Sequence, residues 1–412
     1  MPEKRKLLKF VIVGHVDHGK STLIGRLLFD TNSLPADKIN EIKKNAQGNS
    51  DLEFAHLLDH FEEERQQDIT IDTTQVFFKT KKTDFVIIDA PGHREFIKNM
   101  ITGATQAEAG ILIVDVKEGI KEQTKRHAYF LSLLGIKQLV VVINKMDLIN
   151  YKKEKFMKLK QKIERFLNKI GIKPVSYVPI SCLEGENIVL KSKKMKWYKA
   201  EPLVKILDKL KNLPSLLFRP LVFPVQDVFK LDSRRLILGK VEAGILRKQD
   251  KLKVLPEGKI ATLKSIEKYQ KNLDKAITGE SIALTFEEPI FIERGNILCH
   301  PQKEPKVKNR FLASIIWLAG EEFKKEDTLF IRCATQKTSC RIEKIFKKID
   351  SVDLRIIKER DFKIKPLEVA EVLIQTKNPI VIEPFEKLAV LGRFVLERDE
   401  EVCAGGIILE EK

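Results

Sequence analysis

The sequence predicts an α/β domain with a doubly wound, mainly parallel sheet, followed by two antiparallel β-barrels. In residues 8–190, apolar runs such as F-V-I-V, F-V-I-I-D and L-V-V-V-I-N alternate with helical segments, which is typical of parallel strands joined by helices. After residue 213, many short β-branched runs are separated by turn signals such as L-P-E-G-K, T-G-E and E-R-G-N, which indicates barrels. A segment with two prolines, H-P-Q-K-E-P-K-V-K at 300–308, indicates a linker. We therefore expect domains at 1–213, 214–304 and 305–412.

Size and composition describe a globular chain. Its 412 residues exceed what one hydrophobic core usually supports, and 43% hydrophobic with 32% charged residues is ordinary for a folded protein. The apolar runs are far shorter than the roughly 20 residues of a membrane helix, and Lys9 interrupts the first of them, so we expect neither a membrane span nor an export signal. Five cysteines without a C-x-x-C pair predict no disulfide framework and no zinc site, which favours a cytoplasmic location.

The net charge of +17 has two interpretations. Clustered lysines and arginines bind nucleic acid by neutralising phosphates. The basic residues here are spread along the chain among many glutamates, which is typical of a solvated surface. One basic and aromatic stretch, K-S-K-K-M-K-W-Y-K at 191–199, stands out as a local exception.

A glycine-rich motif follows the first predicted strand. G-H-V-D-H-G-K-S at 14–21 fits the phosphate-binding P-loop pattern, in which backbone amides at the start of a helix surround phosphate oxygens. Lys20 is expected to reach the β and γ phosphates, and Ser21 to bind Mg²⁺. The predicted phosphate-contacting residues are Gly14, His15, Val16, Asp17, His18, Gly19, Lys20, Ser21 and Thr22.

The next motif, D-A-P-G-H at 89–93, follows the strand F-V-I-I. Asp89 is expected to hold the metal ion, and the amide of Gly92 to contact the γ phosphate, so that the loop distinguishes a triphosphate from a diphosphate. Directly after the glycine, His93 is expected to face the attacking water. Thr70, in R-Q-Q-D-I-T-I-D, is a candidate second hydroxyl ligand of Mg²⁺.

Two later motifs predict guanine recognition. N-K-M-D at 144–147 ends the strand L-V-V-V-I, and the Asp147 carboxylate can accept from both N1–H and the 2-amino group of guanine. Lys145 is expected along the base face, and Asn144 is expected to brace the loops. Ser181, Cys182 and Leu183 supply a backbone amide for guanine O6, although Cys182 is equally a small residue of the core. In this order the motifs predict a P-loop GTPase domain that binds GTP or GDP with Mg²⁺.

The motifs G-H-V-D-H-G-K-S-T, D-A-P-G-H and N-K-M-D, with the long segment from Ser21 to Thr70, resemble the translation-factor superfamily of GTPases. The resemblance implies a GTPase domain followed by two β-barrels. It also implies that His93 positions the catalytic water, with Val16 and Ile69 as the apolar pair that gates it.

The later segments resemble a narrower family, the large subunits of bacterial sulfate adenylyltransferase. The resemblance rests on F-P-V-Q-D-V-F-K at 223–230, R-R-L-I-L-G-K-V-E-A-G-I-L-R-K-Q-D at 234–250, I-E-R-G-N-I-L at 292–298, the segment around Trp317 and G-R-F-V-L at 392–396. It implies that GTP hydrolysis drives the formation of adenylyl sulfate and pyrophosphate from ATP and sulfate, both bound on a small partner subunit.

Two departures keep an alternative open. Asp68 stands where that family usually has glycine. The residues of the motif G-H-V-D-H-G are also more similar to those of the elongation factors than to those of the sulfate-activating members. The alternative is a GTPase that resembles elongation factor Tu or 1α and carries aminoacyl-tRNA, for which the charge of +17 would be the RNA footprint.

Overall fold

The computed structural model describes residues 5–34, 75–89, 107–212, 216–231, 234–268, 271–357 and 361–411. Its internal contacts divide the chain into two compact units, Met1–Leu213 with Ser351–Asp353, and Pro214–Asp350 with Leu354–Lys412. The finer boundaries at 1–213, 214–304 and 305–412 stay a prediction.

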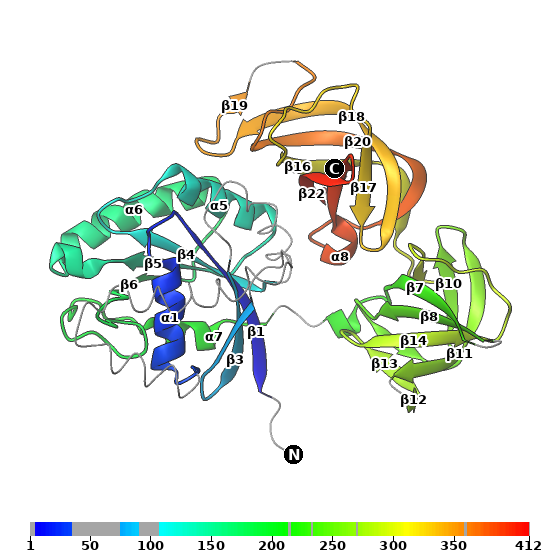
Figure 1. The fold of residues 1–412 in the computed structure, drawn as a ribbon, viewed down its shortest axis with the longest axis horizontal. Helices are drawn as coiled ribbons and strands as arrows, with labels where there is room; N and C mark the ends of the chain where they lie inside the picture. The colour runs from blue at the N-terminus through cyan, green and yellow to red at the C-terminus, as the bar shows by residue number, and fades with distance from the viewer. Residues whose placement is uncertain are drawn as a thin grey trace, which may run out of the picture. The chain divides into compact units, whose positions relative to one another are not determined.

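The first unit is built on a six-stranded sheet (Figure 1). Its strands are β1 (Lys6–Gly14), β2 (Gln75–Lys79), β3 (Thr83–Asp89), β4 (Ala109–Asp115), β5 (Leu139–Asn144) and β6 (Ser176–Pro179). In space the order is β2-β3-β1-β4-β5-β6, and every pairing is parallel except that of β2 with β3. The carboxyl ends of the five parallel strands therefore lie at one edge.

Helices cover both faces of this sheet. They are α1 (Lys20–Asp30), α5 (Glu122–Leu133), α6 (Lys153–Lys169) and α7 (Leu203–Lys209), with a short 3₁₀ turn at Met146–Ile149. Helix α1 packs with α7 into one core cluster through Leu23, Ile24 and Leu27, while α5 and α6 lie on the opposite side (Figure 1). The buried positions of α6 recur at helical spacing, which is why that otherwise charged segment folds as an amphipathic helix: Phe156, Leu159, Ile163 and Leu167.

The second unit contains two closed antiparallel barrels. The first barrel consists of β7 (Phe223–Leu231), β8 (Arg234–Lys240), β10 (Lys251–Leu255), β11 (Lys259–Lys268), β14 (Ser281–Phe286) and β15 (Ile297–Cys299), with the small strands β9 (Ile245–Arg247), β12 (Lys271–Leu273) and β13 (Lys275–Ile277). Pairing of β10 with β11 closes the circuit β10-β15-β7-β8-β14-β11. Its core is formed by the inward residues of these strands, including Phe223, Leu246 and Leu298.

The second barrel follows the same principle. Its strands are β16 (Lys306–Trp317), β17 (Leu329–Cys333), β18 (Gln336–Asp350), β20 (Glu368–Ile382), β21 (Arg393–Arg398) and β22 (Glu401–Ile408), with β19 (Ile356–Ile357) at its edge and the short helix α8 (Ala389–Gly392). Pairing of β17 with β18 closes the circuit. Burial alternates strictly along β17, as a one-sided core requires, and Trp317 is the largest fully buried side chain among the described residues. The predicted fold class is thus confirmed.

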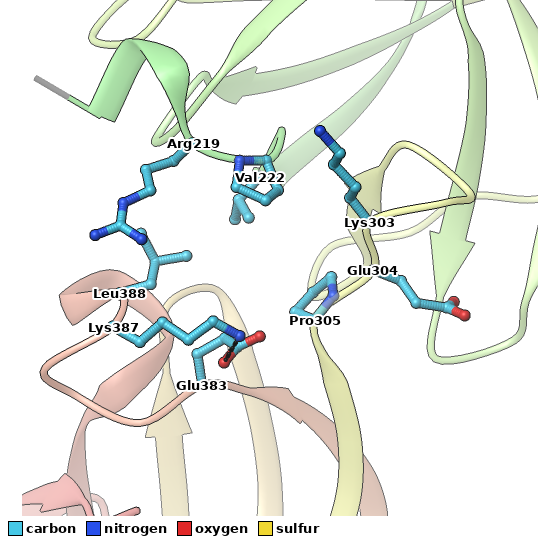
Figure 2. A pocket seen from close by; sticks show the side chains of 9 residues that line it. Arg219, Val222, Lys303, Glu304, Pro305, Glu383, Lys387 and Leu388 are labelled. Carbon is cyan, nitrogen blue, oxygen red and sulfur yellow. Dashed lines mark ion pairs between the residues drawn. The ribbon is translucent and has the colours of Figure 1, made fainter.

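A pocket of about 170 Å³ lies in the second unit (Figure 2). It is lined by the segment before β7, the linker before β16 and the loop after β20. The buried Glu383 carboxylate, at its floor, lies 2.8 Å from Lys387 Nζ, and Arg219 and Lys303 stand at its rim. A buried anion below a cationic rim gives no consistent charge preference for a ligand.

Candidate nucleotide-binding site

The phosphate loop connects β1 to α1, and its backbone conformation requires glycine. Gly19 has a φ of +90°, and a Cβ there would lie 2.4 Å from Asn144 Nδ2. A Cβ on Gly14 would lie 2.6 Å from the Ile113 carbonyl oxygen. Lys20 Nζ donates to the carbonyls of Gly14 at 3.1 Å and His15 at 2.9 Å, which holds the ammonium inside the loop. The loop therefore presents one positive charge beside the backbone amides at the start of α1.

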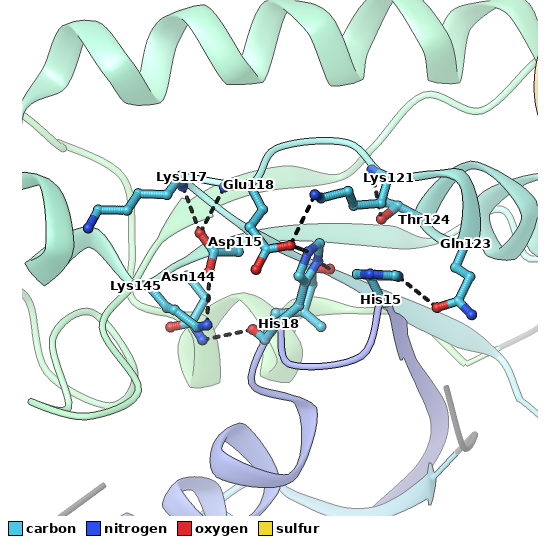
Figure 3. A network of polar contacts seen from close by, with 12 residues as sticks. His15, His18, Asp115, Lys117, Glu118, Lys121, Gln123, Thr124, Asn144 and Lys145 are labelled. Atoms are coloured by element: carbon cyan, nitrogen blue, oxygen red, sulfur yellow. Dashed lines mark hydrogen bonds and ion pairs between the residues drawn. The ribbon is translucent and has the colours of Figure 1, made fainter. Parts of the chain in front are cut away.

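Imidazoles pack around this loop, and Figure 3 shows two of them, His15 and His18. Burial lowers the pKa of His18, whose Nε2 lies 3.7 Å from Glu118 Oε2, too far for a hydrogen bond. Burial also lowers the pKa of His127, to about 3, and this ring bonds the Gly14 backbone. His15 Nδ1 lies 2.7 Å from Gln123 Oε1. His18 and His127 thus shape the loop without adding charge at neutral pH.

Asn144, at the end of β5, joins two loops. Its Nδ2 donates to the His18 carbonyl at 3.0 Å, and its Oδ1 accepts the amide of Cys182 at 3.1 Å. The side chain is buried, so both bonds are shielded from water. This geometry is what the expected bracing role requires.

Lys145 and Asp115 form an ion pair beside Asn144 (Figure 3). Lys145 has a φ of +62°, which turns the chain after β5, and its Nζ lies 2.9 Å from Asp115 Oδ2. Burial by itself raises the pKa of the Asp115 carboxyl, but bonds from Lys145 and from the amides of Lys117 and Glu118 outweigh it and hold the pKa below its ordinary value. Asp147 follows, half-buried, in the 3₁₀ turn.

The loop at 181–186 approaches the same edge of the sheet. Ser181 pairs with Glu186 as an isolated antiparallel bridge, and Ser181 Oγ accepts the amide of Glu184 at 3.2 Å. Cys182 is fully buried, and burial raises the pKa of its thiol. Its amide is already taken by Asn144. Of the predicted base-reading residues Ser181, Cys182 and Leu183, only Leu183 has an N–H without an acceptor among the described residues, so its amide can serve guanine O6.

Several predicted residues lie outside the described part of the chain: Ile69, Thr70, Gly92 and His93, together with the side chain of Asp89. The backbone of Asp89 ends β3 and pairs with Ile12, two residues before Gly14. Val16 and Asp17 lie in the phosphate loop, and Ser21 and Thr22 lie in the first turn of α1. Ser21 is exposed at the start of α1, so its hydroxyl is an oxygen donor of the kind that Mg²⁺ prefers.

The sequence interpretation gave no role to three residues that the structure places here: Asp115, His127 and Arg26. Asp115 carried a signal, because it is the polar residue that ends the run G-I-L-I-V-D, as Asp89 and Asn144 end theirs. His127 lies within α5 and bonds the backbone of Gly14, the last residue of β1. No local pattern marks such a contact.

Comparison with known proteins adds the family. The model of the elongation factor Tu GTP-binding domain matches residues 5–217, and the model of the eEF1A C-terminal domain-like family matches residues 310–409. The chain belongs to the translation-factor GTPases. Within this family it is similar to curated relatives of two kinds.

One kind carries the name elongation factor 1-alpha. The protein from Thermoplasma acidophilum is 38% identical over 100% of this chain and 100% of its own length. The other kind carries the name sulfate adenylyltransferase subunit 1. The protein from Bacteroides thetaiotaomicron is 36% identical over 96% of this chain and 84% of its own length, and the one from Bacteroides fragilis is 37% identical over 96% and 83%. The resemblance of the sequence to the translation-factor GTPases, and within them to the large subunits of sulfate adenylyltransferase, is thereby confirmed.

Among the helices that the structure describes, none combines the length and apolar character that crossing a membrane requires.

Proposed function

We propose that this GTPase is the GTP-hydrolysing subunit of a heteromeric sulfate adenylyltransferase. The observation that carries the proposal is the similarity to sulfate adenylyltransferase subunit 1, which spans 96% of the chain and so includes both barrels as well as the GTPase domain. On the partner subunit, an oxygen of sulfate attacks the α phosphorus of ATP, pyrophosphate leaves, and adenylyl sulfate forms. On this chain, water attacks the γ phosphorus of GTP, and GDP and phosphate leave.

The described residues support the assignment of phosphate, Mg²⁺ and guanine contacts to different parts of the nucleotide site. Lys20, held by the loop carbonyls, is placed to move onto the β and γ phosphates, while the amides of the loop bind their oxygens. Mg²⁺, when bound, neutralises phosphate charge, and we assign its ligands to Ser21, Thr70 and Asp89. Asp147 and the amide of Leu183 read the guanine edge.

Hydrolysis is assigned to the segment that lies outside the described residues. Gly92 contacts the γ phosphate, His93 orients the water, and Val16 with Ile69 gates access to it. Orientation and electrostatic stabilisation account for such a step without proton abstraction by the imidazole. A loop whose contacts differ between GTP and GDP can bias the catalytic cycle of a bound partner.

The second candidate is a carrier of aminoacyl-tRNA, because the relatives named elongation factor 1-alpha match the chain at 35–38% over 98–100% of its length. Charge pairing in the second unit weighs against it, since many of its cations face carboxylates and are not free for phosphates. Such pairs include Lys253–Glu304 at 2.7 Å, Lys268–Glu280 at 2.9 Å, Arg310–Glu343 at 2.6 Å and Arg398–Asp327 at 3.1 Å.

One experiment tests both candidates. The chain is mixed with a small ATP-pyrophosphatase-like subunit, and GTP hydrolysis is measured with and without ATP and sulfate, alongside adenylyl sulfate formation. We expect hydrolysis to rise with both substrates and adenylyl sulfate to form only while GTP is consumed. His93→Ala is the control, expected to keep GTP affinity and slow both reactions. Absence of stimulation, together with tight GTP-dependent binding of aminoacyl-tRNA at physiological salt, would replace the first candidate by the second.

A further inference from the structure

Arg26 lies on α1 and reaches the loop at 181–186, although 157 positions separate it from Leu183. Its NH1 donates to the Leu183 carbonyl at 3.2 Å. Its Nε donates to both carboxylate oxygens of Asp30, at 3.0 and 2.9 Å, one turn further along the same helix. The side chains of Arg26 and Asp30 are only 18% and 15% exposed, so the guanidinium is held within the protein surface.

Gly185 completes this contact. Its φ is +72°, and a Cβ at this position would lie 2.1 Å from Arg26 NH2. The planar guanidinium therefore lies directly against the backbone of the loop. A lysine, with one ammonium on a flexible stem, cannot bond Leu183 and Asp30 in the same fixed geometry.

Arg26 contacts Leu183, the residue whose amide we assign to the recognition of guanine O6. Of the three residues predicted to read the base, Ser181 N–H bonds the Glu186 carbonyl and Cys182 N–H bonds Asn144, which leaves Leu183 N–H for the base oxygen. Arg26 bonds the carbonyl of that same residue. Because a bond from a charged donor is stronger than a neutral one, it fixes the orientation of Leu183.

We propose that Arg26 is a positioning residue that aims the Leu183 amide at guanine O6 and links the phosphate-binding helix to the base-binding loop. The inference rests on the guanine site of the proposed function and holds for either candidate output. Arg26 makes no contact with the nucleotide in this role. We expect the effect on O6 to pass through the bond to the Leu183 carbonyl, and the test below separates that effect from a general support of the fold.

The test uses three nucleotides: GDP, inosine diphosphate, which lacks the 2-amino group, and 2-aminopurine riboside diphosphate, which lacks O6 and with it N1–H. Their affinities are measured by calorimetry on the full chain in magnesium buffer. The loss of the Asp147 contact to N1–H is the same in every variant, so a change in preference between variants reports O6. We expect Arg26→Gln to weaken GDP about tenfold, the usual effect of losing one hydrogen bond to a charged group. The preference for GDP over the O6-lacking nucleotide falls by the same factor, while the preference over inosine diphosphate is unchanged because Asp147 still reads the 2-amino group.

Matched variants separate positioning from folding. Asp30→Asn keeps the bond from Arg26 to Leu183 and is expected to change the O6 preference far less than Arg26→Gln. Arg26→Lys is expected to recover part of that preference, and Gly185→Ala, which displaces the guanidinium, is expected to lose it as Arg26→Gln does.

The outcomes are distinct. If Arg26→Gln and Gly185→Ala weaken all three nucleotides by one common factor, Arg26 is structural and the inference is overturned. If the parent chain binds none of the three, the guanine site itself fails, and the inference with it. Selective loss of the O6 preference, with thermal unfolding midpoints of Asp30→Asn and Arg26→Gln alike, supports the inference.

Discussion

Replacing Asn144 by alanine removes a side chain that bonds the phosphate loop and the guanine loop at once. The two bonds, at 3.0 Å to the His18 carbonyl and 3.1 Å from the Cys182 amide, are both buried. Each contributes about 1 kcal/mol to stability, and each backbone group left without a partner costs about 1 kcal/mol more at the lower end of its range. We therefore expect Asn144→Ala to lower the free energy of unfolding of the first unit by about 4 kcal/mol, the sum of these contributions.

The assay is urea unfolding followed by tryptophan fluorescence. The chain has two tryptophans, and in a Trp317→Phe background Trp197 reports the first unit. Asn212→Ala is the control, because Asn212 also donates to a backbone carbonyl, that of Leu7 at 2.8 Å, but in an exposed position. An exposed bond of this kind is expected to contribute no more than about 1 kcal/mol. If the two variants unfold at the same urea concentration, the proposed bracing by Asn144 is refuted.

Three further predictions concern the same site. In the folded chain the pKa of His127 is about 3 against an ordinary 6.5, so below pH 6.5 the unfolded chain takes up a proton that the folded chain does not. His127 therefore lowers stability by about 1.4 kcal/mol per unit as the pH falls below 6.5. His127→Gln is expected to remove this contribution and leave that of His18, when thermal unfolding is compared at pH 7.5 and 5.5; an unchanged loss would refute it. Gly19→Ala places a Cβ 2.4 Å from Asn144 Nδ2 at a φ of +90°, and calorimetry is expected to show GDP binding weakened at least about tenfold; an unchanged affinity would mean that the loop does not bind phosphate in this conformation. Asp147→Asn is expected to relax the preference of GDP over xanthosine diphosphate by about 10-fold or more, measured by competition; retained preference would remove Asp147 from base recognition.

The edge of the sheet was predictable because its signals are local. Each apolar run ends in a polar or glycine residue, and parallel strands bring such ends together, so the amino-acid sequence alone places Gly14, Asp89 and Asn144 at one edge. The turns of the barrels were equally predictable from local residues. Gly258 and Gly295, in two of the turn signals, have φ of +82° and +102°, a backbone conformation that favours glycine. What these features share is that a few neighbouring residues determine them.

Contacts between distant segments were not predictable. Arg26 is one basic residue on a helix face until the loop at 181–186 folds against it, and His127 is one polar residue in α5 until β1 places Gly14 beside it. Closure of each barrel through β10–β11 and β17–β18 likewise depends on packing across the barrel, which no single strand encodes. The unassigned residues of the site are therefore those whose partners lie far away in sequence.

Arg26 and Asn144 together constrain how the two halves of the nucleotide site can respond. Asn144 connects the phosphate loop to Cys182, and Arg26 connects the following helix, α1, to Leu183. Two adjacent residues of the loop at 181–186 are therefore linked to the phosphate-binding segment. A displacement of α1 is then expected to move the Leu183 amide. Binding of the base and binding of the phosphates each change the affinity for the other by one common factor, because coupling of binding free energies is reciprocal. Removing either tie should therefore make the affinity of the chain for free pyrophosphate less dependent on occupancy of the base site by guanosine. Equal dependence in the parent chain and in Arg26→Gln would show that Arg26 does not couple the two halves.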